Sequence, residues 1–203
     1  MRTTTLLVGL ALPLLLPTPV AADDKSGVDE DGFLQRWLVL APIPFAANET
    51  GTDALDKEQL KDEAKLKPKV GDKLKVSDKE FVWKEYTCPD HLLDFNRLLG
   101  VETEDSVAYA VTLVVSPAEF KDVKMKTGSD DQSKVYLNGR EVFKFAEERA
   151  AEKDQDTTDV TLRKGVNVLV VKVVNVKVDW SFCVRFTGRN DKPLANLKSQ
   201  TAE

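Results

Sequence analysis

The chain is poor in the residues that most enzymes use for acid–base and nucleophilic chemistry. Its 203 residues include one histidine, His91, and two cysteines, Cys88 and Cys183. Catalytic Cys–His pairs usually come from distant segments, so Cys88 and His91, three residues apart, do not indicate a nucleophile. One histidine and two cysteines are also too few for a typical structural zinc site. The sequence has no glycine-rich phosphate loop and no G-x-S-x-G motif. We therefore expect a protein that is not an enzyme.

An excess of basic residues is lacking as well. The formal net charge is −5, and acidic and basic residues are interspersed along the chain. Nucleic-acid-binding domains carry a basic face instead. Eight lysines lie between Lys57 and Lys79, but acidic residues stand among them, which is typical of a solvated surface. We expect no nucleic-acid partner.

Long apolar segments are missing apart from one short run near the start, Leu6–Leu16. Arg2 precedes this run and the small residues Val20–Ala22 follow it, which is the pattern of a secretory signal peptide cleaved after Ala22. A membrane anchor needs about 20 apolar residues, about twice the length of this run. We expect a signal peptide at 1–22, a flexible leader at 23–32, one domain at 33–190 and a tail at 191–203.

These signals predict a mature protein that is secreted or periplasmic, with no membrane partner after cleavage. In such a compartment a pair of cysteines suggests a disulfide. Cys183, however, lies inside an apolar run. A bridge from Cys88 to Cys183 and two buried free thiols therefore both remain open.

Short apolar runs separated by Gly, Asn, Asp and Pro turns make up most of the remaining chain. Residues Phe33–Phe45 are apolar on both faces and include prolines near the end, which predicts a buried strand. In Asp53–Leu66 apolar residues fall near helical spacing, which predicts a surface helix capped by Asp53. From Val76 onward the chain has the pattern of strands, such as Val107–Val115. Because no helices alternate with them, we expect an all-β antiparallel sandwich with one or two short surface helices.

The stretch GSDDQSKVYLNG, residues 128–139, ends in the strongest hairpin signal of the chain. Asn138 and Gly139 accept the positive φ angles of a type I′ turn, and a two-residue loop fixes the strand register. Tyr136 and Phe143 should share the face opposite the core, as cross-strand packing or as a ligand platform. The predicted pairs are Leu137 with Arg140, Tyr136 with Glu141, Val135 with Val142 and Lys134 with Phe143.

Three sequence stretches resemble the galactose-binding-like jelly-roll domains, which include the sugar-binding domains of family 2 glycoside hydrolases and related carbohydrate-binding modules. The matching motifs are V-x-L-N-G at Val135–Gly139, G-x-N-x-L at Gly165–Leu169 and an aromatic strand at Trp180. Upstream, RWLVLAPIPF and SVAYAVTLVV are similar to stretches in small exported bacterial proteins. The resemblance, from about Phe33 to Gly188, implies a jelly-roll fold and a carbohydrate ligand. The two aspartates before YLNG also resemble the PA14 β-sandwich, in which paired aspartates bind calcium and loops bind glycans.

Aromatic side chains and acidic loops supply the candidate site residues. Aromatic rings stack on the apolar faces of sugars, which favours Trp180 near a strand start over Trp37 in an apolar strand; Trp83 stays undecided. Carboxylates are the hard oxygen ligands that calcium prefers, and the jelly-roll domains often carry a structural calcium. Alternatively, Asp130 and Asp131 accept backbone N–H bonds within a loop. The predicted ligand-binding residues are Trp180, Tyr136, Asn138 and Arg185, and the predicted calcium ligands are Asp130, Asp131, Asp154 and Asp156.

The sequence thus predicts an exported, non-catalytic binding module with a carbohydrate ligand. The alternatives are a module that binds an extracellular protein or supports the cell envelope, and, third, a hydrolase. Two carboxylates across a cleft would favour the hydrolase, whereas a wide apolar patch would favour a protein partner. Lys172, inside an apolar strand, is expected to reach the sheet edge or to pair with an acid.

Overall fold

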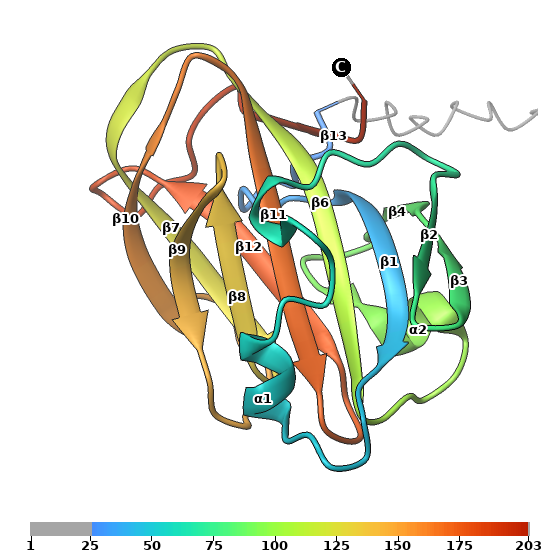
Figure 1. Ribbon diagram of the computed structural model, residues 1–203. Helices are drawn as coiled ribbons and strands as arrows, with labels where there is room; N and C mark the ends of the chain where they lie inside the picture. Colours follow the sequence, from blue (N-terminus) through green and yellow to red (C-terminus); the bar gives the residue numbers. More distant parts are fainter. Residues whose placement is uncertain (1–25, 203) are drawn as a thin grey trace, which may run out of the picture.

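A computed structural model describes residues 26–202, so the predicted signal peptide lies outside the described residues. Two antiparallel sheets pack against each other (Figure 1), which confirms the predicted all-β sandwich. The larger sheet has the order β4 (Lys84–Thr87), β1 (Arg36–Pro44), β6 (Ser106–Ser116), β11 (Gly165–Asn175), β8 (Ser133–Leu137) and β9 (Arg140–Phe145), with β13 (Lys198–Gln200) also paired to β6. The smaller sheet has the order β10 (Asp156–Leu162), β7 (Phe120–Asp130), β12 (Ser181–Thr187) and β5 (Leu93–Asp94). A separate hairpin pairs β2 (Lys73–Val76) with β3 (Lys79–Val82).

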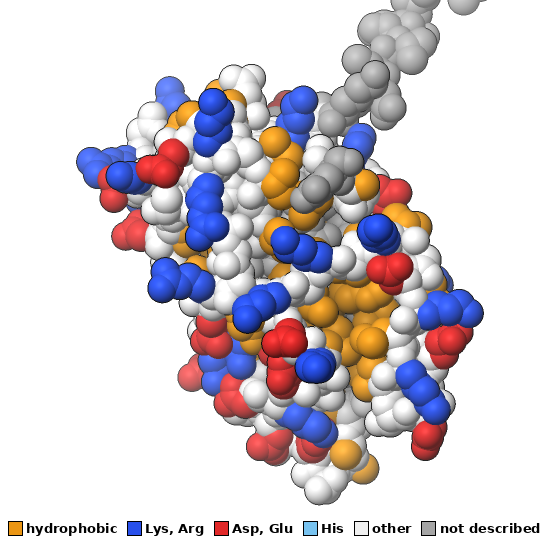
Figure 2. All heavy atoms as spheres, turned by 45° about the horizontal axis from the view of Figure 1, so that its top comes forward, with side chains coloured by type: hydrophobic (Ala, Val, Ile, Leu, Met, Phe, Trp, Pro, Cys, Tyr) orange, Lys and Arg blue, Asp and Glu red, His pale blue; other side chains and the backbone are white. Residues whose placement is uncertain are grey.

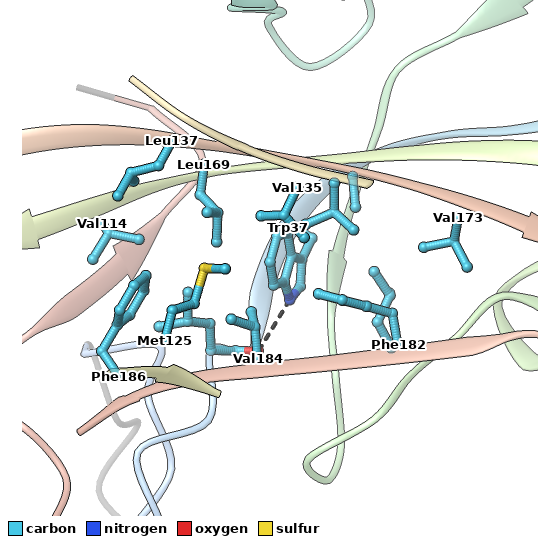
Figure 3. Close-up of a cluster of buried hydrophobic side chains, with 14 of the residues drawn as sticks. Trp37, Val114, Met125, Val135, Leu137, Leu169, Val173, Phe182, Val184 and Phe186 are labelled. Carbon is cyan, nitrogen blue, oxygen red and sulfur yellow. Dashed lines mark hydrogen bonds between the residues drawn. The ribbon is translucent and has the colours of Figure 1, made fainter. Parts of the chain in front are cut away.

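The core lies between the two sheets and consists of alternate residues from their facing sides (Figure 3). Leu169 of the larger sheet meets Met125 and Val184 of the smaller sheet in this layer. Trp37 is 1% exposed, and its indole nitrogen donates to the carbonyl of Leu34 at 3.0 Å. Trp37 is therefore a core residue, as its apolar strand predicted, and its polar atom is satisfied inside the core.

The segment predicted as one surface helix, Asp53–Leu66, contains two short helical elements instead. α1 (Gly51–Asp56) begins after Thr50, whose hydroxyl accepts from the Asp53 backbone while the Asp53 carboxylate accepts from the Thr50 backbone. Asp53 is thus the third residue of a capping box and not the cap itself. η1 (Glu63–Lys65) follows after a turn. Leu55 and Leu60 are both buried. Residues five positions apart do not lie on the same face of one straight helix, so the break between the two elements is what allows both side chains to be buried.

A buried polar network holds this segment on the outer face of the larger sheet. Lys172 has no exposed surface, and its ammonium group donates to two backbone carbonyls at the end of α1 and to Glu63 at 3.2 Å. Tyr109 and Tyr136 both donate their hydroxyls to Glu63. Burial lowers the pKa of Lys172, and the charge of Glu63 acts in the opposite direction. The predicted pairing of Lys172 with an acid is confirmed.

The β8–β9 hairpin follows the predicted register only near its turn. The first two pairs after Asn138 and Gly139 are those expected, but a β-bulge then shifts the register between the strands. As a result Val135 lies opposite Phe143 and not Val142. A bulge places two residues of one strand against one of its partner. Phe143 consequently packs against the core between the sheets, and its predicted place beside Tyr136 is wrong.

Both ends of the described chain join the sandwich. Residues 191–202, expected as a tail, include β13, and Leu197 is buried in the core. In the expected leader, Val28 forms a bridge with Leu34. Within residues 26–202 no helix is long and apolar enough to span a membrane.

Cys88 and Cys183 are buried free thiols, so the alternative without a disulfide is the one observed. Burial raises the pKa of each thiol to about 12. Thiols in this state are inert, because the thiolate is the reactive form.

Candidate functional site

The predicted ligand-binding residues do not form one cluster. Trp180 lines a pocket of about 240 Å³ at one end of the smaller sheet, together with Asp130. Tyr136 and Asn138 belong to the hairpin of the larger sheet, and Arg185 lies in β12. The pocket that joins Trp180 and Asp130 is the candidate site, because it combines a predicted ligand-binding residue with a predicted metal ligand.

Strand register builds the floor of this pocket. Ser181 of β12 lies opposite both Asp130 of β7 and Asp94 of β5. Residues directly opposite each other on adjacent strands point to the same face. The next residue of β12 lies in the core, so these three side chains point away from the core. Asp179 and Trp180, just before β12, complete the floor.

The adjacent aspartates of the GSDD stretch have different surroundings, and the peptide bond between them is cis. Asp131 accepts the backbone N–H groups of Arg149 at 3.3 Å and Val176 at 3.0 Å. This is the structural alternative considered for the pair. Asp130 lines the pocket and is 7% exposed. Burial, followed by the charges of Asp131 and Asp179, raises the pKa of Asp130 to about 7. Asp130 therefore changes its protonation near neutral pH.

Trp180 is buried, with 1% of its surface exposed. Its ring packs on Phe95, the first residue of α2 (Phe95–Leu99), with 4.8 Å between the ring centroids. It therefore does not form the exposed stacking platform that we expected. Its indole nitrogen has no hydrogen-bond partner within residues 26–202.

The loop between β9 and β10 forms the roof of the pocket through Ala150 and Ala151. It lies so close to β7 at Gly128 that a Cβ atom there would be 1.8 Å from the carbonyl oxygen of Glu152. Real Cβ atoms do not approach an oxygen at this distance. The glycine of the GSDD stretch thus lets the roof lie directly on the sheet.

Ion pairs involve the other two predicted calcium ligands. Asp154 accepts from the guanidinium of Arg185 at 2.8 Å. Burial opposes ionisation of Asp154, but the hydrogen bond and charge of Arg185 outweigh it and lower the pKa of Asp154. Asp156 pairs with Arg149. Within the described part of the chain, no group of three or more His, Cys, Asp or Glu is placed to hold a metal ion. The four predicted calcium ligands are not brought together.

Tyr136 and Asn138 are held by the fold. Tyr136 is 6% exposed, and its hydroxyl donates to Glu63 at 2.6 Å. The Asn138 amide donates to the side chain of Asn167 at 2.9 Å, and its oxygen accepts from the backbone of Val168 at 3.1 Å. Asn138 therefore joins the hairpin turn to β11, in addition to permitting the turn itself.

Three polar pocket residues, Asp94, Asp179 and Ser181, were not predicted as site residues from the sequence. Asp179 and Ser181 flank Trp180, so their position beside it was an available signal. Asp94 reaches the pocket only because β5 pairs with β12. A two-residue strand has no recognisable pattern, so the sequence carries no local signal for that contact.

Comparisons with known proteins give similarity at the level of structure. No family model and no curated protein matches the chain. Among solved structures, the chain is similar to a "PA14 sugar-binding domain from RTX adhesin", with a TM-score of 0.41 and 10% sequence identity. The match covers 81% of this chain and 96% of that chain. At these values it assigns neither a family nor a ligand, and the galactose-binding-like resemblance stays a prediction.

Proposed function

We propose that this protein is an exported, non-catalytic module that binds a carbohydrate in the pocket of Asp130. The observation that supports the proposal is the set of polar groups around one small space: three carboxylates, from Asp94, Asp130 and Asp179, and the hydroxyl of Ser181. Carboxylates accept hydrogen bonds from sugar hydroxyls. A space of about 240 Å³ suits one sugar unit rather than a long chain.

The arrangement of the carboxylates supports binding over hydrolysis. A glycosidase needs two carboxyl groups on either side of the scissile bond. Asp130 and Asp94 instead stand in a row on one sheet face, with Ser181 between them. Asp94 also caps α2, because its carboxylate accepts from the backbone of Arg97 at 2.9 Å. That contact holds one of its oxygens away from a substrate.

Calcium remains part of the proposal only at Asp130 and its pocket neighbours. Calcium takes 6–8 oxygen ligands. Because no three carboxylates of the described residues are placed together to hold a metal ion, Asp130 and at most one neighbouring carboxylate would bind it, with water as the remaining ligands. A cation there would offset the repulsion between Asp130 and Asp179, which contributes to the raised pKa of Asp130. Asp154 and Asp156 are engaged in ion pairs, so they are not included.

The experiment is a glycan-array screen of the purified protein, with calcium and with chelator. The variants are Asp130→Asn and Asp179→Asn, each of which removes one carboxylate of the pocket. The control is Asp159→Asn, an exposed aspartate on β10. We expect binding to a defined glycan, weakened about tenfold or more by each pocket variant and unchanged by the control.

Three outcomes would contradict parts of the proposal. If no glycan binds in either condition, the carbohydrate ligand is wrong, and an extracellular protein becomes the leading partner. If a glycan binds but chelator has no effect, the calcium part is wrong. If the bound glycan is cleaved, and Asp130→Asn abolishes the cleavage, the protein is a hydrolase.

A further inference from the structure

An apolar groove lies on the outer face of the larger sheet, away from the carbohydrate pocket. Its floor is formed by Leu38 of β1 and by Val111 and Leu113 of β6. One wall is the loop 67–70, and the other is the C-terminal segment 200–202. The groove has a volume of about 650 Å³. A space-filling view shows apolar side chains gathered in a hollow, with Lys, Arg and acidic side chains around its margin (Figure 2).

Apolar side chains of the groove are left in contact with solvent. Val70 on the wall is 58% exposed, a value that it shares with Val178 and that only Val101 exceeds among the large exposed hydrophobic residues of the described chain. Leu38 and Val111 are each only 2% exposed, so the floor is recessed below the walls. Covering such surface with an apolar group is favourable by about 25 cal/mol per Å². The narrow recess fits a single extended alkyl chain better than it fits a flat surface of another molecule.

The charged residues that line the groove are both basic, while the acidic side chains of Glu85 and Asp72 lie at its margin. Lys67 and Lys69 both line it, and within residues 26–202 neither ammonium group has an ion-pair partner within 4.0 Å. Lysine covers apolar surface with its methylene stem and keeps its charged head in water. The polar side chain of Thr201 on the opposite wall is already bonded to Glu85. An anionic group at the lysine side of the groove is therefore the complementary partner.

We propose that this groove binds a single-chain amphiphile with a carboxylate head, namely a free fatty acid. The alkyl chain lies on Leu38 and Val111 and covers Val70, while the carboxylate lies between Lys67 and Lys69. The volume is within the range of about 300 to 1,000 Å³ that small-molecule sites occupy. A protein partner is disfavoured because stable interfaces bury about 800 Å² on each side, far more than this narrow recess provides.

The test is calorimetric titration of the purified protein with octanoate, decanoate and dodecanoate below their micelle-forming concentrations. Each pair of added methylene groups should tighten binding about tenfold, because each buries further apolar surface. Dodecanol, which has the same chain without the charge, should bind about tenfold more weakly than dodecanoate.

Matched variants locate the site. Val70→Asp should weaken dodecanoate binding at least about tenfold, whereas Val101→Asp, at a position of similar exposure (60% against 58%), should not change it. The double variant Lys67→Glu and Lys69→Glu should weaken binding about tenfold or more. Lys121→Glu, at an exposed lysine outside the groove, is its control.

Several results would overturn the proposal. These are the absence of fatty-acid binding, affinity that does not depend on chain length, and equal losses in the groove variants and their controls. Binding only to vesicles of anionic phospholipid would indicate a membrane surface instead. Because Asp130 does not line the groove, Asp130→Asn should leave dodecanoate binding unchanged, so this test is independent of the carbohydrate proposal.

Discussion

Replacing Asp130 with asparagine tests whether the pocket holds a carboxylate that the fold disfavours. The pKa of Asp130 rises from its ordinary value of 3.8 to about 7, first through burial and then through Asp131 and Asp179. That difference corresponds to at most about 4 kcal/mol. Water in the open pocket screens the charge, so we expect about 1 to 2 kcal/mol. The folded state holds the proton more tightly, and ionisation therefore lowers the free energy of unfolding. This loss of unfolding free energy is absent below pH 3.8, grows as the pH rises and is complete above about pH 7.

The assay is urea unfolding of the wild-type protein and the variant near about pH 4 and about pH 8. Near the upper pH, Asp130→Asn should be more stable by about 1 to 2 kcal/mol, and near the lower pH the two proteins should be equal. The exposed Asp159→Asn should be neutral at both. The same stability difference at both pH values, or a less stable Asp130→Asn at high pH, would refute this account of the pocket. The pH dependence matters because a ligand that needs ionised Asp130 gains affinity across the same range.

Further predictions concern the roof, the buried network and the thiols. Gly128→Ala should destabilise the protein by about 1–3 kcal/mol or more and reduce glycan binding, because its Cβ would displace the loop at Glu152; urea midpoints and the glycan screen measure both effects. Glu63→Ala should cost about 3–5 kcal/mol in urea unfolding, since it leaves a buried ammonium group unpaired; Glu63→Gln should lose less. Cys88 and Cys183 should react with a thiol reagent only in denaturant, and reducing agent should not shift the unfolding midpoint; a shift would indicate a disulfide.

The fold was largely predictable because local patterns agree with the tertiary structure. The apolar run around Trp37 became a central strand, and the Asn138–Gly139 turn became a hairpin. The differences between prediction and structure arise from a register shift and from a long-range strand pairing. The bulge in β9 moved Phe143 to the other face, and nothing in the sequence of a regular alternating strand reveals such an insertion. Within the expected tail, Lys198–Gln200 pair with β6, which is a long-range contact without a local signal.

The candidate site was predictable only in part. The sequence singled out Trp180 as a ligand-binding residue and Asp130 as a calcium ligand, but it showed neither that both line one pocket nor that the Trp180 ring is buried. Burial depends on α2, which places Phe95 against the indole ring. The four predicted calcium ligands do not form one site, for a different reason. Arg149, seven residues before Asp156, and Arg185, 31 residues after Asp154, pair with two of these aspartates, and the sequence alone does not reveal which cation an acid meets.

The two proposed sites also explain why the fold motifs did not identify a ligand. The motifs around Val135 and Leu169 place residues in the core between the sheets, where they stabilise the sandwich, and none of their residues lines either proposed site. The carbohydrate pocket is closed by the β9–β10 loop on one outer face, and the groove is bordered by the loop 67–70 on the other. No residue lines both. Loops on a rigid scaffold can change without disturbing the core, so binding properties are encoded in segments that strand motifs do not include. Each site should therefore be lost by substitution of its own loop while the protein stays folded and the other ligand stays bound.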